Sequence, residues 1–396
     1  MLTAPLLFVL IGLVLGSDAI GLHFEIGHSS IHLIAEVTLI LVLFGDASRI
    51  DLRALKSELG IPVRLLLIAM PLTIAFGGGV AYLIFPGLGI AQAFLVGAIL
   101  APTDAALGQS VVSSPVVPKR IRQGLNVESG LNDGIAVPII LLLLCLASAQ
   151  TEGGRTATEW VWFAAKQLSL GPATGILVGF VGSALLTRGK EQDWFSESLE
   201  RLLGVIIAII AFTGAETVGG NGFIAAFLGG MVMGNRSRNV RTPVYEFLEA
   251  EGQLVSLLVF LLLGATLAWP VLEHVSPKHI LYALASLTVI RLFPTALSLI
   301  GAKLRPSSVL FLGWFGPRGL ASILFAMVAL EEGTTADPHG VFTIVIITVL
   351  LSVLLHGITA SPLSEIYGRA MQREPKNCKE EHKDVFSHPT RRRESK

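Results

Sequence analysis

The chain has 396 residues, of which 52% are hydrophobic and only 15% are charged, with a formal net charge of zero and two cysteines, Cys145 and Cys378. A soluble domain carries about 25% charged residues, so the composition excludes an ordinary globular protein and indicates a polytopic membrane protein. The balanced charge argues against a nucleic-acid partner, and two isolated cysteines exclude a disulfide scaffold and a zinc site.

Twelve apolar runs predict an all-α protein with about 12 transmembrane helices, since one crossing of the hydrocarbon core needs about 20 residues of helix. The predicted spans 1 to 12 cover residues 3–22, 29–47, 61–85, 88–108, 124–149, 166–187, 201–218, 220–234, 252–270, 279–300, 307–330 and 340–362. Span 1 lacks a basic segment and a cleavage site, so we interpret it as a retained helix rather than a signal peptide. Residues 1–365 are expected to form the transporter domain, and residues 366–396 a polar, disordered cytoplasmic tail.

Lys and Arg residues are concentrated in alternate loops. The loops after spans 2, 4, 6, 8 and 10 carry fifteen of them, whereas the opposite loops carry only Arg155, Lys166 and Lys278. By the positive-inside rule the basic loops face the cytoplasm. We therefore expect an integral protein of the plasma (inner) membrane with both termini in the cytoplasm.

Several ionisable residues fall inside the predicted spans, where a charge at mid-bilayer costs about 2.5–3.5 kcal/mol. They are Glu36, Asp104, Glu128, Asp133, Glu216, Arg291 and Arg318. The plainest explanation for any one of them is a buried pair that holds helices together, and Glu128 with Arg291 is the pairing that we expect. Glu36 and Glu216 are predicted to lie near the outer ends of their spans, and His356 to be a packed histidine at a helix end.

Span 4 is interrupted by Ala101-Pro102-Thr103-Asp104. Proline removes a backbone donor and clashes with the preceding turn, so the helix should unwind here. Unwound backbone at membrane depth survives only inside protein or beside a water-filled cavity. The segment offers free backbone carbonyls, the hydroxyl of Thr103 and the carboxylate of Asp104, and oxygen groups of this kind are the ligands that a small cation prefers.

Span 5 carries a dense polar patch, Glu128-Ser129-Gly130-Leu131-Asn132-Asp133. On a helix, Ser129 and Asp133 share one face, and Glu128 and Asn132 share the neighbouring strip. So many polar groups in one apolar span favour a binding site over simple packing.

Span 11 contains a second interruption, Phe315-Gly316-Pro317-Arg318-Gly319. Spans 4 and 11 run in opposite directions, and paired Gly/Pro breaks at matching positions of two halves are typical of inverted-repeat transporters with a site at mid-membrane. Spans 3–5 and 10–12 are the predicted repeats, with the two discontinuous helices crossing. Arg318 is expected to offset the carbonyl-rich helix ends at this crossing.

These motifs together resemble the NhaP/NHE-type branch of the monovalent cation/proton antiporters. The resemblance also covers Asn221-Gly-Phe-Ile-Ala-Ala-Phe-Leu-Gly-Gly and Leu354-Leu-His-Gly-Ile-Thr-Ala-Ser-Pro-Leu, and extends from about residue 4 to 363. The resemblance implies a sodium/proton antiporter-like fold and a homodimer. Many members begin with a further helix before the segment similar to residues 2–16; the charge count favours a twelve-span chain with a cytoplasmic N-terminus.

The resemblance also implies roles for individual residues. In the family, the cation and the proton bind at positions matching Asp133, Asp104, Thr103 and Ser129, while Glu128 and Arg291 match a buried pair. Asn132 before Asp133 is the pattern that accompanies electroneutral exchange in the family. No cofactor is implied.

We therefore expect a secondary antiporter, not an enzyme, that exchanges Na⁺ (or Li⁺ or K⁺) for protons by alternating access. Burial disfavours a charged carboxylate, so Asp133 should hold a proton until a cation displaces it. A sodium-coupled organic-anion symporter on a similar fold is the alternative, with Arg318 as its anion site. A channel or a membrane enzyme is disfavoured, because the sequence has neither a pore filter nor a nucleophile–base set.

Overall fold

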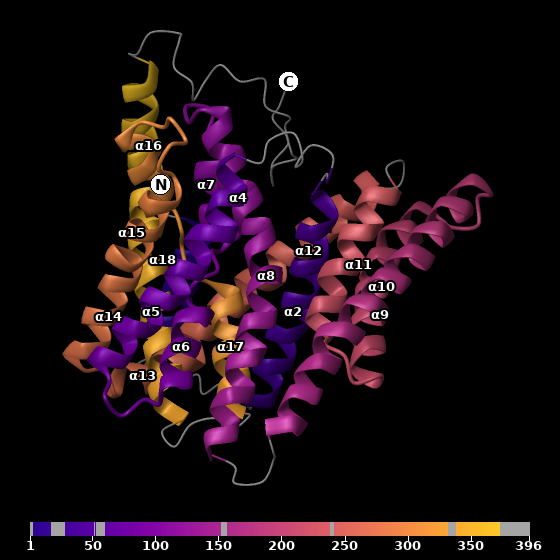
Figure 1. Cartoon of the computed structure of the whole chain (residues 1–396). Helices are drawn as coiled ribbons and strands as arrows, with labels where there is room; N and C mark the ends of the chain where they lie inside the picture. The colour runs from indigo at the N-terminus through magenta and orange to yellow at the C-terminus, as the bar shows by residue number, and fades with distance from the viewer. Residues whose placement is uncertain are drawn as a thin grey trace.

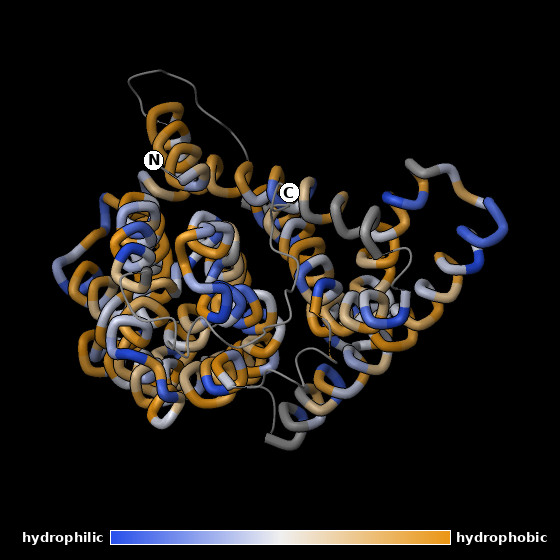
Figure 2. Tube along the Cα trace, turned by 90° about the horizontal axis from the view of Figure 1, so that it is seen from above, coloured by the Kyte–Doolittle hydropathy of each residue, from blue (hydrophilic) through white to orange (hydrophobic). Residues whose placement is uncertain are grey.

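The computed structural model describes residues 3–16, 28–50, 52, 60–151, 157–237, 241–331 and 338–372. Every regular element in these residues is helical (Figure 1), and each of the twelve predicted spans coincides with a helix or with an interrupted helix. Seven helices are long and apolar enough to cross a membrane, and shorter apolar helices accompany them. Apolar residues cover much of the outside of the helices (Figure 2), as expected of a chain surrounded by lipid.

One group of helices, here named the flanking bundle, consists of α1 (Ala4–Leu15), α2 (His28–Arg49), α9 (Ala157–Glu191), α10 (Glu197–Thr217), α11 (Gly222–Arg236) and α12 (Arg241–Leu262). Helix α12 continues through one π-helical turn, η2 (Leu263–Leu267), into α13 (Ala268–Glu273). The backbones of α9 and α11 almost touch, since a Cβ atom on Gly175 would lie 2.4 Å from the carbonyl oxygen of Ala225. Small residues permit this close packing in membranes.

The second group, here named the core bundle, consists of α4 (Ile61–Arg64), η1 (Leu65–Ala69), α5 (Met70–Ile84), α6 (Ile90–Ile99), α7 (Ala105–Val112), α8 (Lys119–Thr151), α14 (Pro277–Leu287), α15 (Val289–Ser298), α16 (Pro306–Trp314), α17 (Leu320–Glu331) and α18 (Pro338–Gln372). It contains the two predicted repeats. Each repeat has, in order, a distorted helix, a broken helix and a long helix. The distortion is the π-helical turn η1 in the first repeat and the non-helical residue Thr288 between α14 and α15 in the second.

Both predicted interruptions are present. Helix α6 ends at Ile99 and α7 begins at Ala105, with Pro102 between them. Helix α16 ends at Trp314 and α17 begins at Leu320, with Pro317 between them. The missing N–H and fixed φ of proline account for breaks at these positions.

Several helices extend beyond the apolar runs that predict them. Helix α8 begins at Lys119 instead of residue 124, and α18 continues to Gln372 instead of ending near 362. The predicted boundary at residue 365 therefore lies inside α18, while residues 373–396 lie outside the described residues. Hydropathy marks only the part of a helix inside the hydrocarbon, which explains these differences.

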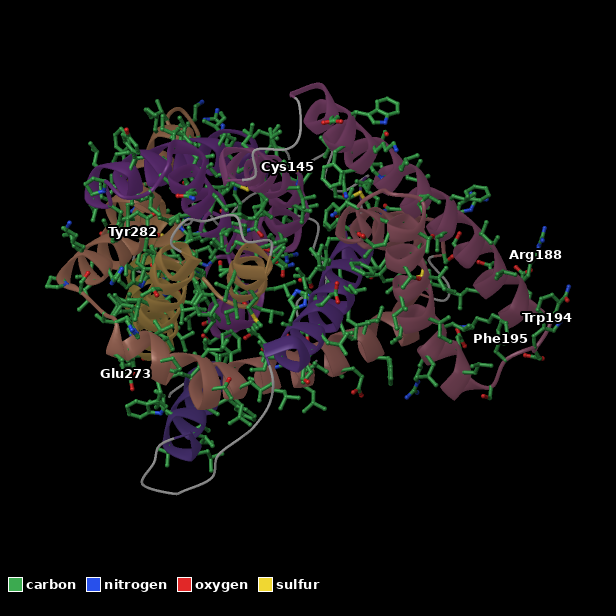
Figure 3. All side chains as sticks on the ribbon, turned by 90° about the horizontal axis from the view of Figure 1, so that it is seen from below. Cys145, Arg188, Trp194, Phe195, Glu273 and Tyr282 are labelled. Carbon is green, nitrogen blue, oxygen red and sulfur yellow. The ribbon has the colours of Figure 1, made fainter. Side chains whose placement is uncertain are left out.

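The two bundles lie side by side in Figure 1, with α14, α15, α16 and α18 on one side and α9, α10 and α11 on the other. Helices α2 and α12 of the flanking bundle face α8 and α17 of the core bundle between them. In Figure 3, Tyr282 marks the core bundle, whereas Arg188, Trp194 and Phe195 mark the far tip of the flanking bundle. The interface between the bundles therefore passes beside α8, the helix that carries Asp133.

Candidate cation site

The two interrupted helices touch at their breaks. The backbone N–H of Asp104 donates to the carbonyl oxygen of Pro317 at 2.8 Å. This hydrogen bond joins the unwound segments of the two repeats, which are 213 positions apart in the sequence, and it brings Thr103 and Arg318 to the same place in the core bundle.

The carboxylate of Asp104 caps two half-helices at once. Its Oδ1 accepts the N–H groups of Ala106 at 2.7 Å and Leu107 at 3.1 Å, at the start of α7. Its Oδ2 accepts the N–H of Leu320 at 2.8 Å, at the start of α17. Both oxygens therefore lie at the N-terminal ends of half-helices, where backbone N–H groups need an acceptor. A carboxylate has about four lone-pair sites, so coordination capacity remains for a cation.

Two glycines of the second break are required by close approach. A Cβ atom on Gly319 would lie 2.1 Å from Oδ2 of Asp104. A Cβ atom on Gly316 would lie 2.6 Å from Nε of Arg291 and 3.1 Å from Cγ2 of Thr103. A larger side chain at either position would separate the breaks, which explains why this motif is Gly-Pro-Arg-Gly.

The carbonyls at the end of α6 are not the free ligands that the sequence suggests. Arg318 is fully buried and its Nη1 donates to the carbonyls of Ala101 at 2.6 Å and Pro102 at 3.1 Å. Ser322 Oγ donates to the carbonyl of Ile99 at 2.7 Å. Unwinding leaves carbonyls that must find donors inside a membrane protein, and side chains of α17 and its preceding break supply them. Arg318 thus offsets the helix end as expected, and the carbonyl ligands are withdrawn from the predicted cation shell.

Helix α8 joins the crossing through Asn132. Its Nδ2 donates to Thr103 Oγ1 at 2.6 Å, and lies 3.4 Å from the Thr103 carbonyl oxygen. Asn132 and Thr103 are both buried, and Oδ1 of Asn132 has no hydrogen-bond partner in the described protein. This contact places the neighbouring residues Asp133 and Asp104 on adjacent elements. Asp133 and Asp104 are both partly exposed.

Ser129 lies one helical turn before Asp133 on the same face of α8. It is 8% exposed, and its Oγ donates weakly to the carbonyl of Asn126 at 3.3 Å. The hydroxyl oxygen keeps its lone pairs, so Ser129 can act as a neutral oxygen ligand beside a carboxylate.

Glu128 and Arg291 form a buried ion pair between Oε1 and Nη2, with both side chains 2% exposed. This is the pairing that the sequence analysis expects. It ties α8 of the first repeat to α15 of the second. Glu128 lies on a different strip of α8 from Asp133, so the pair joins the two repeats without involving Asp133.

Glu216 lies in the last turn of α10, near the end of its span as predicted, and it is exposed. Its Oε1 accepts the N–H of Gly222 at 2.7 Å at the start of α11, where the Asn221 side chain also accepts the N–H of Ile224. His356 is 1% exposed and lies in the middle of α18, so the prediction of a helix-end histidine is wrong. Glu36 is a partly exposed residue of α2 in the flanking bundle.

Aromatic side chains close the bundle interface next to Asp133. A Cβ atom on Gly134 would lie 2.4 Å from the ring of Phe227 of α11, so this ring rests directly on α8. The ring of Phe223 of α11 lies 5.9 Å, centroid to centroid, from that of Phe325 of α17. A further contact between the bundles is polar, with Gln253 Nε2 of α12 donating to Gln109 Oε1 of α7 at 3.2 Å.

Sequence reasoning missed Ser322, Ser352 and Phe227. Single serines and one phenylalanine in apolar spans carry no distinguishing pattern of their own. The one usable signal is the spacing of Ser352, His356 and Thr359, which lie on one face of a helix. All three make hydrogen bonds to the break between α16 and α17.

The oxygen atoms gathered here suit a hard monovalent cation. Thr103 and Ser129 offer neutral oxygens, Asn132 offers a buried amide oxygen, and Asp104 and Asp133 offer carboxylates. Oxygen ligands are the set that hard cations prefer, and a carboxylate can exchange such a cation for a proton. Of the two buried bases, Arg291 is paired with Glu128, whereas Arg318 donates to backbone carbonyls and not to a carboxylate.

Comparison with known proteins agrees with this geometry. The sequence model of a family described as "Sodium/hydrogen exchanger, transmembrane" matches residues 1–366. A K⁺/H⁺ antiporter NhaP2 of Shewanella sp. (strain ANA-3) is 25% identical over 365 residues, which cover 91% of this chain and 62% of the relative. The low-affinity Na⁺/H⁺ antiporter NhaS1 of Synechocystis sp. (strain PCC 6803 / Kazusa) is 28% identical over 384 residues, covering 89% of this chain and 67% of that protein.

The chain therefore spans about three fifths of the length of the first of these relatives. Among solved structures, the sodium proton antiporter MjNhaP1 from Methanocaldococcus jannaschii at pH 8 superposes with a TM-score of 0.73. The sequence identity is 22%, and the match covers 92% of each chain. At this identity the likeness concerns the fold, an antiporter fold with helices arranged as described above.

Proposed function

Because the chain belongs to the sodium/hydrogen exchanger family, a family of membrane transporters, we propose that it exchanges a monovalent cation, Na⁺, Li⁺ or K⁺, for protons. The observation that carries the proposal is the hydrogen bond from Asn132 to Thr103. It joins the helix of Asp133 to the crossing point of two broken helices, which is the place where transporters of this architecture bind their ions.

The proposed ligands are Asp133, Asp104, Thr103 and Ser129. Asn132 holds Thr103, Arg318 holds the carbonyls before it, and Glu128 with Arg291 locks the surrounding helices. Asp133 is the carboxyl that exchanges its proton for the cation. Asp104 joins the two half-helices at the site, because its oxygens accept backbone N–H groups of α7 and α17.

The formal charges around the crossing support a one-for-one, electroneutral exchange. The two breaks, the Glu128–Asp133 segment of α8 and helix α15 together hold three acids, Asp104, Glu128 and Asp133, and two bases, Arg291 and Arg318. Their formal charges sum to minus one, and either one proton or one monovalent cation bound at the site brings the sum to zero. Burying an uncompensated charge in a low-dielectric interior is costly, so the loaded forms move between the two sides more readily than the empty form.

Alternating access follows from movement of the core bundle against the flanking bundle. The site lies on α8 and the two breaks, beside the interface with α2 and α11. Rocking of one bundle against the other around a fixed site is the general mode of transporters with inverted repeats. The cation and the proton compete for Asp133 on each side in turn.

The organic-anion symporter has little support from this geometry. Its anion site would need an available base, and Arg318 is fully buried with Nη1 donating to the carbonyls of Ala101 and Pro102. Arg291 is engaged by Glu128 in the same way. A small cation fits the remaining oxygen groups better than an organic anion does.

We further propose that the protein resides in the plasma (inner) membrane with both termini in the cytoplasm and works as a homodimer. The distribution of basic residues among the loops supports the orientation. In-vesicle accessibility of single cysteines placed in the loops around Arg188 and Lys278 tests it, since these loops are predicted to lie on opposite sides.

The test of the exchange itself uses purified protein in liposomes loaded with a pH-sensitive dye. Adding Na⁺, Li⁺ or K⁺ outside should drive the cation inward and protons outward, so the pH of the dye-filled interior should rise. Asp133→Asn should reduce the response to that of protein-free liposomes, while Glu200→Gln should not. Glu200 pairs with Lys190 at 3.1 Å, and Lys190 stands in the sequence between Arg188 and Trp194, which mark the far tip of the flanking bundle in Figure 3. A response to none of the three cations by the unmodified protein contradicts the proposal.

A further inference from the structure

The face of α18 formed by Ser352, His356 and Thr359 holds the break between α16 and α17. Ser352 Oγ accepts the N–H of Arg318 at 2.7 Å. His356 Nε2 lies 2.9 Å from the carbonyl oxygen of Trp314, the last residue of α16. Thr359 Oγ1 accepts the indole N–H of Trp314 at 3.2 Å. Each of the three residues therefore makes one hydrogen bond to the unwound segment or to Trp314, which directly precedes it.

We propose that His356 is a positioning residue of the exchange site, which holds the break between α16 and α17 through an N–H on Nε2. The proposal rests on the proposed function, and it assigns a role to the Leu-Leu-His-Gly segment that the exchange chemistry does not use. His356 touches no cation. It fixes the break through Trp314 on one side and through Ser352 and Arg318 on the other.

Both ring nitrogens of His356 lie close to a carbonyl oxygen. Nε2 lies 2.9 Å from the carbonyl oxygen of Trp314, while Nδ1 lies 2.9 Å from the carbonyl oxygen of Ser352 and 3.3 Å from Ser352 Oγ. Ser352 belongs to α18 itself, so only the contact with Trp314 ties the ring directly to the break. A carbonyl oxygen can only accept, so this contact uses an N–H on Nε2. Ser352 connects the same face to the break a second time, because its Oγ accepts the N–H of Arg318 at 2.7 Å.

The surroundings hold the ring in one place. His356 is 1% exposed. Its ring lies 5.3 Å, centroid to centroid, from the ring of Trp314 and 6.4 Å from that of Phe315. A buried polar group needs a hydrogen-bond partner, and the carbonyl of Trp314 provides one for Nε2.

The link to the site is short. The carbonyl of Trp314 also accepts the N–H of Gly316 at 2.8 Å, so His356 binds the tight turn that starts the break. Two residues later, Arg318 donates to the carbonyls of Ala101 and Pro102, directly before Thr103 and Asp104. Loss of the His356 bond should therefore loosen the segment that carries two proposed ligands and weaken cation binding, without removing any ligand.

Three variants of His356 separate this role from simple packing. The amide nitrogen of glutamine reaches the place of Nε2, so His356→Gln keeps a donor for the Trp314 carbonyl. The amide nitrogen of asparagine reaches only the place of Nδ1, so His356→Asn loses that donor. Leucine fills the volume of the ring and has no donor at all. We expect His356→Gln to keep the apparent KM for the cation close to that of the unmodified protein. His356→Asn and His356→Leu should raise it about tenfold, with a smaller change in maximal rate. The second readout is the rise of Tm on adding Na⁺, Li⁺ or K⁺ to the detergent-solubilised protein, which should shrink in parallel.

Two further variants on the same face complete the test. Thr359→Val removes the partner of the Trp314 indole and leaves the carbonyl contact intact, so its KM should not change. Ser352→Ala breaks the chain to Arg318 and should raise KM as His356→Asn does; it decides the matter if the His356 variants do not fold. The proposal is overturned if Asn or Leu keeps the unmodified KM, if Gln behaves like Leu, or if Ser352→Ala changes nothing. Failure of the unmodified protein to exchange any cation overturns the proposed function, and this inference with it.

Discussion

Asp104 and Pro317 are joined by a backbone hydrogen bond of 2.8 Å, although they lie in different repeats. The same residue, Asp104, caps α7 with one carboxylate oxygen and α17 with the other. The two half-helices that begin at the crossing thus share a single negative charge. One side chain therefore satisfies backbone N–H groups that two interrupted helices would otherwise leave unpaired inside a membrane. Asp104 thus contributes to the stability of the fold as well as to the charge of the site.

Asp104→Asn is therefore predicted to lose stability as well as transport. An amide has one acceptor oxygen, and its NH₂ group must face either Leu320 N–H or the two N–H groups of α7. A buried donor left without a partner costs about 1–3 kcal/mol. Thermal unfolding in detergent without cation should show a lower Tm for Asp104→Asn, whereas Asp133→Asn should lose transport at an unchanged Tm. Equal Tm values for Asp104→Asn and the unmodified protein would contradict the double-cap interpretation.

The Glu128–Arg291 pair gives a second prediction about stability. Breaking a buried pair leaves an uncompensated charge and costs about 3–5 kcal/mol, so Glu128→Gln and Arg291→Met should each unfold far more easily. The double variant should recover part of the loss, because no charge is then left alone. The matched control is the exposed pair Glu365–Arg369, whose side chains are 56% and 72% exposed. Glu365→Gln should change stability little, since surface pairs contribute about 0–1 kcal/mol. A double variant no more stable than the singles refutes the charge argument.

Comparison of sequence and structure shows where local patterns are sufficient. The twelve spans follow from apolar runs, and the two breaks follow from Pro102 and Pro317, because both signals are local. The pairing of Glu128 with Arg291 also follows, since each span offers few possible partners. These features could be predicted from the sequence.

Contacts between distant segments could not be predicted. Nothing near Ala101 shows that its carbonyl is bound by Arg318, 217 residues away, and this is why the break looks like a ring of free ligands in the sequence. The contact of Phe227 with Gly134 depends on how α11 crosses α8, which no periodicity records. Helix ends beyond the hydrocarbon, such as Gln372, are equally invisible to hydropathy.

Exchange is predicted to be insensitive to membrane potential. One proton and one monovalent cation carry the same charge through the same core bundle, so the complete cycle moves no net charge. Moving one uncompensated charge would couple the cycle to voltage by about 2.3 kcal/mol per 100 mV. Proteoliposomes clamped with valinomycin and fixed K⁺ gradients, with Na⁺ or Li⁺ as the tested cation, measure this directly. Turnover that changes severalfold between 0 and −100 mV would refute electroneutral exchange.

Competition at Asp133 predicts the pH dependence of the cation affinity. Lowering the pH loads the carboxyl with protons, so the apparent KM for the cation should rise on the acidic side, by about tenfold per pH unit if one proton displaces one cation. The maximal rate at saturating cation should change much less. The initial rate of proton movement, measured over a matrix of cation concentrations and equal internal and external pH values, gives both quantities. A constant KM with a falling maximal rate would mean that the proton acts at another group.

The aromatic contacts between the bundles predict which surfaces must separate during each cycle. Phe223 belongs to α11 of the flanking bundle and Phe325 to α17 of the core bundle, with their rings 5.9 Å apart. Phe223 also lies 5.1 Å from Phe212 of α10, which belongs to the same flanking bundle. One residue therefore takes part in two contacts of similar length, one across the interface and one within a bundle. If the core bundle moves against the flanking bundle, only the first contact opens.

Cross-linking of cysteine pairs tests this difference in a background where Cys145 and Cys378 are replaced by serine. The pair Phe223→Cys with Phe325→Cys, joined by a short bifunctional thiol reagent, should stop proton exchange in proteoliposomes, and reductive or chemical cleavage of the linker should restore it. The pair Phe212→Cys with Phe223→Cys should cross-link without loss of activity, because both residues move together. Each pair before cross-linking provides the baseline for the loss of its two rings. Full activity of the cross-linked Phe223–Phe325 pair would show that the bundles exchange ions without parting at this side, and the rocking motion proposed here would be wrong.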